Sequence, residues 1–159
     1  MAVDLRVRPA RPEDLPQLVR LWRELIGFDE ALGGQDFRLA AGAPEQWERH
    51  LRAHIGKRSR AAHVAEVEGK PVGFLLASLE QPPGIFMERK FGHISAVYVQ
   101  EASRRKGAGG ALVAAALGWF GDKRVGRVRV ASDARNGLGV EFWKKLGFQT
   151  TVLTMDKLL

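Results

Sequence analysis

The first third of the chain changes from strand-like to helix-like spacing of its apolar residues. Apolar and polar residues alternate over 3–7 and stop before Pro9, which is typical of a half-buried strand. Leucine, valine, tryptophan and isoleucine then recur every three or four residues over 15–26, and Asp14 stands where it can cap such a helix. The sequence therefore predicts a strand followed by an amphipathic helix.

The middle of the chain predicts a loop, a helix and a hairpin. Residues 27–43 mix glycine, alanine and charged residues without either period, so we expect a loop or a broken helix there. Apolar residues on one side predict a helix over 44–55. Two alternating runs, 61–67 and 71–79, flank a Glu-Gly-Lys turn at 68–70, which favours an antiparallel β-hairpin.

The second half of the chain alternates strands with helices. Strands are predicted over 91–99, 125–130 and 148–155, and helices over 107–120 and 136–146. The whole order is β-α-α-β-β-β-α-β-α-β, with antiparallel strands first and alternating elements later. We therefore expect an α/β fold in which helices flank a mixed central β-sheet, built as a single domain over 1–159.

The composition excludes several kinds of site and several classes of protein. The chain has no cysteine, which excludes disulfides, thiolate metal sites and a cysteine nucleophile. No segment approaches the roughly 20 apolar residues that cross a bilayer, and Asp4 and Arg6 interrupt the opening before a secretory leader could form, so we expect a cytoplasmic protein. The net charge of +7 suits nucleic acid, an anionic membrane surface or a polyphosphate ligand, and charge alone does not choose among them.

The segment 103–111, Ser-Arg-Arg-Lys-Gly-Ala-Gly-Gly-Ala, lies between a predicted strand and a predicted helix. Glycines at a helix start let free backbone N–H groups close around an anion, and the three basic residues add positive charge at the same point. The segment lacks the Gly-Lys-[Ser/Thr] of a nucleotide-binding P-loop, and leucine at position 112 breaks the dinucleotide fingerprint G-x-G-x-x-G. These residues therefore predict a phosphate or pyrophosphate site of another kind.

Here the sequence resembles the GNAT superfamily of acyl-CoA-dependent N-acyltransferases, whose motif is R/Q-x-x-G-x-G/A. That motif matches residues 104–109, and a V-Y-V strand end precedes it at 97–99. RPARPEDLPQLVRLW at 8–22 and EGKPVGFLLAS at 68–78 look like the family's opening elements and central hairpin, and FWKKLGF at 142–148 is similar to its last helix. Four matches in the right order cover essentially the whole chain.

The resemblance implies that acetyl-CoA is a co-substrate and that the two central strands splay apart, so that one of them pairs with the pantetheine arm. It implies the following residues for cofactor binding: Val97, Val99, Arg104, Arg105, Lys106, Gly107, Ala108, Gly109, Gly110, Asn136 and Trp143. The activity that it implies is transfer of an acetyl group to a primary amine by direct attack in a ternary complex. We expect the acceptor to be a small-molecule or peptide amine, in a cleft between the two central strands that is walled by 27–43 and by the turn near 81–90.

The sequence constrains the catalytic residues less than it constrains the cofactor-binding residues. Trp143 stands where the family usually has a proton-donating tyrosine, and an indole N–H does not give up its proton. The single tyrosine, Tyr98, either substitutes for it or packs into the sheet. His93, Asp133 and Glu88 are candidate general bases, each with a structural alternative, and a water relay is the remaining option.

The sequence also bears on a non-catalytic role, nucleic-acid binding and metal binding. Replacement of the tyrosine by Trp143 leaves open a non-catalytic acyl-CoA-binding module on the same fold. Nucleic-acid binding is disfavoured, because the basic residues are scattered and no recognition motif is present. His50 and His54 have the spacing of two metal ligands but no third ligand, so we expect no metal and interpret them as surface or interface histidines. The sequence does not decide between a monomer and a homodimer.

Overall fold

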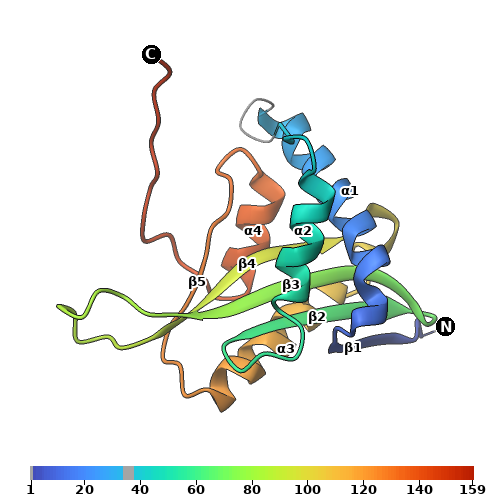
Figure 1. The fold of residues 1–159 in the computed structure, drawn as a ribbon, viewed down its shortest axis with the longest axis horizontal. Coiled ribbons are helices and arrows are strands. Elements are labelled where there is room, and N and C mark those ends of the chain that lie inside the picture. Colours follow the sequence, from blue (N-terminus) through green and yellow to red (C-terminus); the bar gives the residue numbers. More distant parts are fainter. Residues whose placement is uncertain (1, 34–37) are drawn as a thin grey trace.

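A computed structural model describes residues 2–33 and 38–159. One mixed sheet runs through it in the order β1-β2-β3-β4-β5. The strands are β1 (Leu5–Pro9), β2 (Arg60–Val67), β3 (Lys70–Glu80), β4 (Phe91–Val99) and β5 (Val128–Val130). The first four pair antiparallel and β5 pairs parallel to β4, which confirms the predicted mixed sheet (Figure 1).

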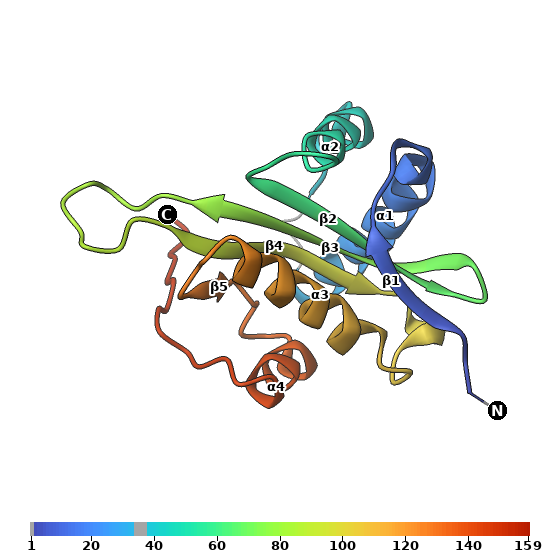
Figure 2. The same cartoon turned by 90° about the horizontal axis from the view of Figure 1, so that it is seen from below.

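Helices cover both faces of this sheet. They are α1 (Leu15–Gly33), α2 (Ala43–Arg52), α3 (Ala108–Asp122) and α4 (Gly137–Lys145), with short 3₁₀ turns η1 (Pro12–Asp14) and η3 (Glu101–Ser103). Figure 2 shows α1 and α2 on one face and α3 and α4 on the other. Among the helices of the described segments, none is long and apolar enough to cross a membrane.

The sheet separates two hydrophobic cores. On one face Leu18, Leu21 and Leu51 are fully buried, and the rings of Trp22 and Trp47 stack at 5.1 Å to join α1 to α2. On the other face Ile94, Leu112 and Phe120 form the centre of the second core. Glycine allows this close packing, because a Cβ at Gly92 would lie 2.5 Å from the Phe120 ring.

The first helix is longer than predicted. Residues 27–33, expected in a loop or a broken helix, continue α1, and 38–42 lack helix before α2. Residues 34–37 of the same segment lie outside the described residues. Gly27 lies on the exposed side of the helix, where its cost of about 1 kcal/mol relative to alanine is offset by the tertiary contacts of Phe28. Tertiary packing therefore overrides a local helix breaker here.

The predicted strand over 148–155 is absent from the structure. Phe148 packs against Trp143 with ring centroids 5.0 Å apart, and residues 149–159 then follow an exposed path without regular structure. The preceding strand is also shorter than predicted, because β5 begins at Val128. The alternating pattern of residues 148–155 thus has no partner strand within the described chain.

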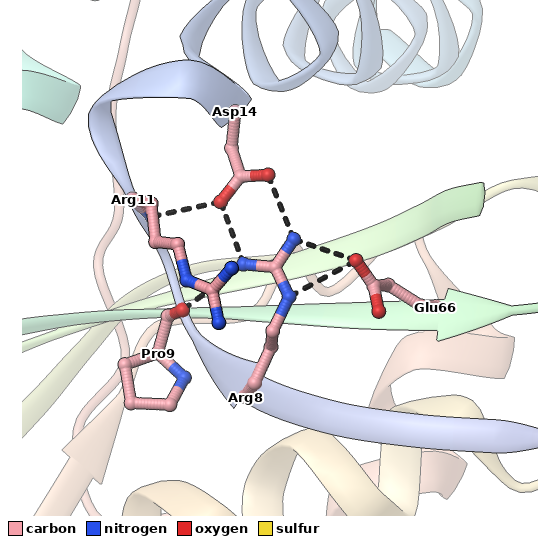
Figure 3. A network of polar contacts seen from close by, with 5 residues as sticks. All are labelled: Arg8, Pro9, Arg11, Asp14 and Glu66. Atoms are coloured by element: carbon pink, nitrogen blue, oxygen red, sulfur yellow. Dashed lines mark hydrogen bonds and ion pairs between the residues drawn. The ribbon is translucent and has the colours of Figure 1, made fainter. Parts of the chain in front are cut away.

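Asp14 does not cap α1, contrary to the prediction. It ends the turn η1, and its carboxylate accepts two hydrogen bonds from Arg8 Nη1 and Nη2, both 2.8 Å, and one from the backbone N–H of Arg11 at 2.7 Å (Figure 3). The same guanidinium donates to Glu66 Oε1 at 2.6 Å. Arg8 therefore ties β1 both to the start of the helical layer and to β2, and its hydrogen bonds lower the pKa of Asp14.

Replacing Arg8 by methionine should remove about 2 kcal/mol of stability near neutral pH, because two carboxylates lose charged hydrogen bonds. The lowered pKa of Asp14 sets the sign of the pH effect: its stabilisation is present above its unfolded-state pKa and is lost as pH falls through the folded-state pKa. Urea denaturation at about pH 7 and about pH 3 should show the wild-type advantage shrinking in acid.

The matched control is Arg6→Met, which changes an exposed arginine on the same strand whose nearest carboxylate, on Asp4, is 3.5 Å away. We expect it to change stability little. Equal losses from the two substitutions would contradict the assigned role of Arg8.

Candidate active site

The site begins where β5 no longer pairs with β4. The parallel pairing covers only Gly92, His93 and Ile94 of β4, opposite Val128–Val130. From position 95 to 99, β4 pairs with β3 on one side, and no strand within 2–33 or 38–159 pairs with it on the other. Ser95 is an extra residue at this point, because Leu76 pairs with Ala96 and the next residue of β3 pairs with Ile94. The two central strands therefore diverge as expected.

The register shows which backbone groups face the open side. The N–H of Gln100 donates to the carbonyl of Val72 on β3 at 2.8 Å. Successive residues of an antiparallel strand alternate in direction, so Tyr98 also faces β3 while Val97 and Val99 face away from it. The carbonyl of Val99 accepts a hydrogen bond from Arg104 Nε at 2.9 Å. The N–H groups of Val97 and Val99 and the carbonyl of Val97 remain directed at the open side.

The basic turn leads from this strand to the start of α3. Two of its residues have left-handed backbone conformations, Arg105 at φ 64° and Gly107 at φ 84°. Gly107 precedes the helix and has no side chain to cap it, and a Cβ at Gly110 would meet nothing within 4 Å. The first N–H groups of a helix lack partners within it and carry the positive end of its dipole. The turn therefore has the backbone conformation and the open space that an anion site at a helix start needs.

Arg104 holds this turn against the sheet. Besides its bond to Val99, its guanidinium lies over the rings of Phe28, at 5.2 Å, and Tyr98, at 5.6 Å. Arg105 and Lys106 are exposed at the surface of the turn. The three predicted basic residues thus divide into one that fixes the turn and two that supply charge beside it.

A cavity of about 630 Å³ lies between the second half of α1 and the start of α4. Phe28 and Leu32 form its α1 wall, and Asn136 and Leu138 belong to its α4 wall. The Asn136 side chain caps α4, its Oδ1 accepting the N–H of Gly139 at 2.9 Å. Asn136 therefore lines this cavity with its side-chain oxygen already engaged.

A second cavity, of about 540 Å³, lies beside the paired ends of β4 and β5. Phe91, Arg127 and Arg129 line it together with Glu88, which is 3.4 Å from each of the two arginines. The loop between β3 and β4 supplies apolar groups from Pro82, Pro83, Phe86 and Met87. This cavity therefore combines apolar walls with three charges, of which Glu88 is balanced by arginine.

His93 lies near the end of the stretch in which β4 and β5 are paired. It is half-buried on β4, opposite Ser78 on β3 and Arg129 on β5, and the next residue is the last of β4 that β5 accompanies. Of the candidate bases, His93 is therefore the one that the sheet register places directly at the divergence.

The candidate residues Asp133 and Tyr98 are engaged in hydrogen bonds with other side chains. Asp133 receives hydrogen bonds from the backbone and guanidinium of Arg135, which lower its pKa and make it a weaker base. The Tyr98 hydroxyl donates to Glu24 on α1 at 3.2 Å, and burial together with that carboxylate raises the pKa of the phenol. Tyr98 thus packs between sheet and helix, which was the structural alternative.

Trp143 and His54 are core residues. Trp143 is 7 % exposed and contacts the rings of Phe142 and Phe148, so little of its indole is left for a cofactor. His54, expected at the surface or an interface, is instead buried, with Nδ1 2.8 Å from the carbonyl of His50 one helical turn earlier. Over residues 2–33 and 38–159, no group of three or more His, Asp or Glu side chains is arranged to hold a metal.

Sequence reasoning missed the contribution of α1. Glu24 and Phe28 contact β4 and the basic turn, and burial, together with the charge of Asp133, raises the pKa of Asp29. The signal was present, because Phe28 and Leu32 continue the helical spacing past Gly27.

Comparison with known proteins shows the family of the chain. The model of the acetyltransferase (GNAT) family matches residues 21–148. An N-alpha-acetyltransferase of Sulfurisphaera tokodaii is 26% identical over 155 residues, covering 92% of this chain and 81% of that protein. The chain therefore belongs to the GNAT acetyltransferase family. It is an acetyl-CoA-dependent N-acetyltransferase.

Two solved structures show the same fold. A tetramutant of the BH1408 protein from Bacillus halodurans superposes with a TM-score of 0.84 at 21% identity, covering 97% of this chain and 99% of that one. The aminoglycoside N-acetyltransferase AAC(6')-Iy in complex with CoA gives a TM-score of 0.76 at 17% identity, covering 100% and 97%.

The helix start allows a charge test of the anion site. Because the space around Gly110 is open, both Gly110→Glu and Gly110→Gln should fold, but only the glutamate places a negative charge beside the proposed diphosphate. We expect the KM for acetyl-CoA of Gly110→Glu to exceed that of Gly110→Gln by about tenfold, the effect of like charges roughly 6 Å apart near water. Equal KM values for the two variants would place the diphosphate elsewhere.

Proposed function

We propose that this enzyme transfers the acetyl group of acetyl-CoA to a primary amine by direct attack within a ternary complex. The observation that carries the proposal is the unpaired stretch of β4 between the basic turn and the divergence at Ile94. From Val99 back to Ile94 an extended strand spans about 17 Å, which suits an arm running from a diphosphate at the turn to a thioester at the divergence. The amide groups of pantetheine match the free groups of Val97 and Val99.

The reaction requires a neutral amine and a place for its proton. The amine nitrogen attacks the thioester carbon, the carbon–sulfur bond breaks, and coenzyme A leaves as a thiolate. His93 takes the proton from the attacking nitrogen, supported by its place at the divergence, and water protonates the thiolate. The absence of cysteine supports direct attack over an acyl-enzyme on sulfur.

We place the acceptor in the cavity beside Phe91 and Arg129, on the far side of His93 from the basic turn. The loop between β3 and β4 walls this cavity, which matches one of the two walls expected for the acceptor. The other expected wall, 27–43, contributes Phe28 and Leu32 to the first cavity instead. The named relatives support an amine acceptor, because one is an N-alpha-acetyltransferase and another acetylates aminoglycosides. The acceptor classes to compare are therefore peptide N-termini and polyamine sugars.

Thiol release from acetyl-CoA tests the function directly, and a chain without cysteine adds no background to a thiol reagent. We expect turnover with either a peptide bearing a free N-terminus or an aminoglycoside, and none with the same peptide blocked at its N-terminus. Tight coenzyme A binding without turnover across the panel would instead support the non-catalytic module, the reading that Trp143 motivates.

The proposed base predicts a specific loss. His93→Ala should lower kcat about a hundredfold with little change in the KM for acetyl-CoA, because the imidazole acts in proton transfer rather than in donor binding. Added imidazole should restore part of kcat in His93→Ala. The control is His50→Ala on α2, which should keep kcat and show no response to imidazole. An unchanged kcat in His93→Ala would remove this residue from the mechanism.

A further inference from the structure

The second cavity, where we place the acceptor, carries an excess of positive charge. Arg127 and Arg129 share one carboxylate there, that of Glu88, whose oxygens lie 3.4 Å from each guanidinium. Hydrogen bonds between charged groups are usually about 2.7–2.9 Å long, so neither pairing is a close one. Two positive charges therefore meet one loosely held negative charge at the wall of this cavity.

Both guanidinium groups can still bind a ligand. The side chains of Arg127 and Arg129 are 61% and 45% exposed, and each guanidinium carries five N–H donors, of which Glu88 engages the nearest. The guanidinium of Arg129 also lies over the ring of Phe91, 4.2 Å from its centroid, which fixes its plane beside the cavity. Arg129 is thus a positioned cation with donors to spare.

The proposed base lies on the same face of the sheet as these groups. Paired residues of neighbouring strands point to one face, and the register pairs His93 with Ser78 on β3 and with Arg129 on β5. Phe91 shares that face because it lies two residues before His93, about 7 Å along the strand. The contact of Arg129 with the Phe91 ring agrees with this placement. Base, ring and guanidinium therefore form one surface.

The charges next to this surface do not cancel the excess. The register also places Arg60 of β2, opposite Ser78, and Glu80 of β3, opposite Phe91, on this face. These two charges are opposite, and the carboxylate of Glu80 accepts a hydrogen bond from the Ser78 hydroxyl at 2.7 Å. One positive charge therefore remains in excess among the groups named. It attracts an anionic group and repels a polycation such as an aminoglycoside.

We propose that the acceptor carries a carboxylate in the same molecule as its amine, and that Arg129 and Arg127 bind this carboxylate while the amine nitrogen lies at His93. The inference rests on the proposed acetyl transfer and narrows its acceptor class. A planar guanidinium binds a carboxylate through two parallel hydrogen bonds. Apolar groups of the loop between β3 and β4, including Phe86 and Met87, contact the rest of the acceptor.

Two kinds of acceptor offer this chemistry, a free amino acid and a peptide whose first residue is acidic. Phenylalanine is therefore compared with its amide, and the peptide amide Glu-Phe with Gln-Phe, so that each pair differs in one carboxylate. We expect Arg129→Gln to lower kcat/KM for the acidic member of the accepted pair about tenfold, and for the neutral member less than about twofold. Comparing wild type and variant on each acceptor separately removes differences in amine basicity.

Three variants control this measurement. Arg6→Gln removes the same charge from β1, at the other edge of the sheet, and should leave both members of each pair unchanged. Arg127→Gln should weaken the acidic member alone, as Arg129→Gln does. Glu88→Gln should lower the KM for the acidic acceptor, because it removes the carboxylate that competes for the two arginines. A folding defect would not produce such a gain.

The outcomes separate this inference from the proposed function. Equal losses for the acidic and neutral members in Arg129→Gln would overturn the carboxylate site and leave acetyl transfer intact. If wild type releases thiol with no acceptor, acetyl transfer fails instead, and the product analogue N-acetylphenylalanine decides on the arginines by calorimetry. It should bind about tenfold more tightly than its amide, and Arg129→Gln should abolish that preference. Equal binding of the acid and the amide by wild type would also overturn the carboxylate site.

Discussion

The shortness of β5 is the constraint on which the site depends. With only three residues, β5 pairs with β4 as far as Ile94 and leaves the later backbone groups of β4 without a partner strand on that side. Buried or half-buried N–H and carbonyl groups need partners, so the open stretch at Val97 and Val99 is a place where a peptide-like ligand gains hydrogen bonds that the protein does not make with itself. The basic turn begins a few residues later, so strand edge and anion site are continuous.

The rest of the fold holds these two parts in position. Glu24 on α1 accepts hydrogen bonds from Tyr98 and Gln100, while Arg104 bonds to Val99 and stacks on Phe28. The end of β4, the basic turn and the first helix are therefore connected by side chains from three elements. On the other face, the absence of side chains at glycines 73 and 92 lets the sheet lie close to Leu112 and Phe120 of α3. Rigid elements thus support a backbone site that has few side chains of its own.

The sequence predicted the helices and strands that depend on local patterns. The predictions were wrong where contacts between distant residues determine the structure. The hairpin of β2 and β3, the strand β4 and the glycine-bearing start of α3 follow from alternation and turn chemistry, and the structure has them. The end of α1 was missed, because Gly27 read as a breaker while the compensating contact of Phe28 lies 76 residues away, at Arg104. The strand predicted over 148–155 was wrong, because alternation alone does not make a strand and this segment has no neighbouring strand among the described residues. Trp143 shows why site residues are harder to predict than strands or helices. Its position in a motif does not reveal that its ring packs into the core.

Amide hydrogen exchange with and without coenzyme A tests the central claim most directly. The account predicts that coenzyme A slows exchange at Val97 and Val99, whose N–H groups face the open side, and at the first residues of α3. The amides of Ala96 and Tyr98, already directed at β3, should not change. Binding of coenzyme A with equal effects on all four strand residues, or with no protection at Val97 and Val99, would contradict it.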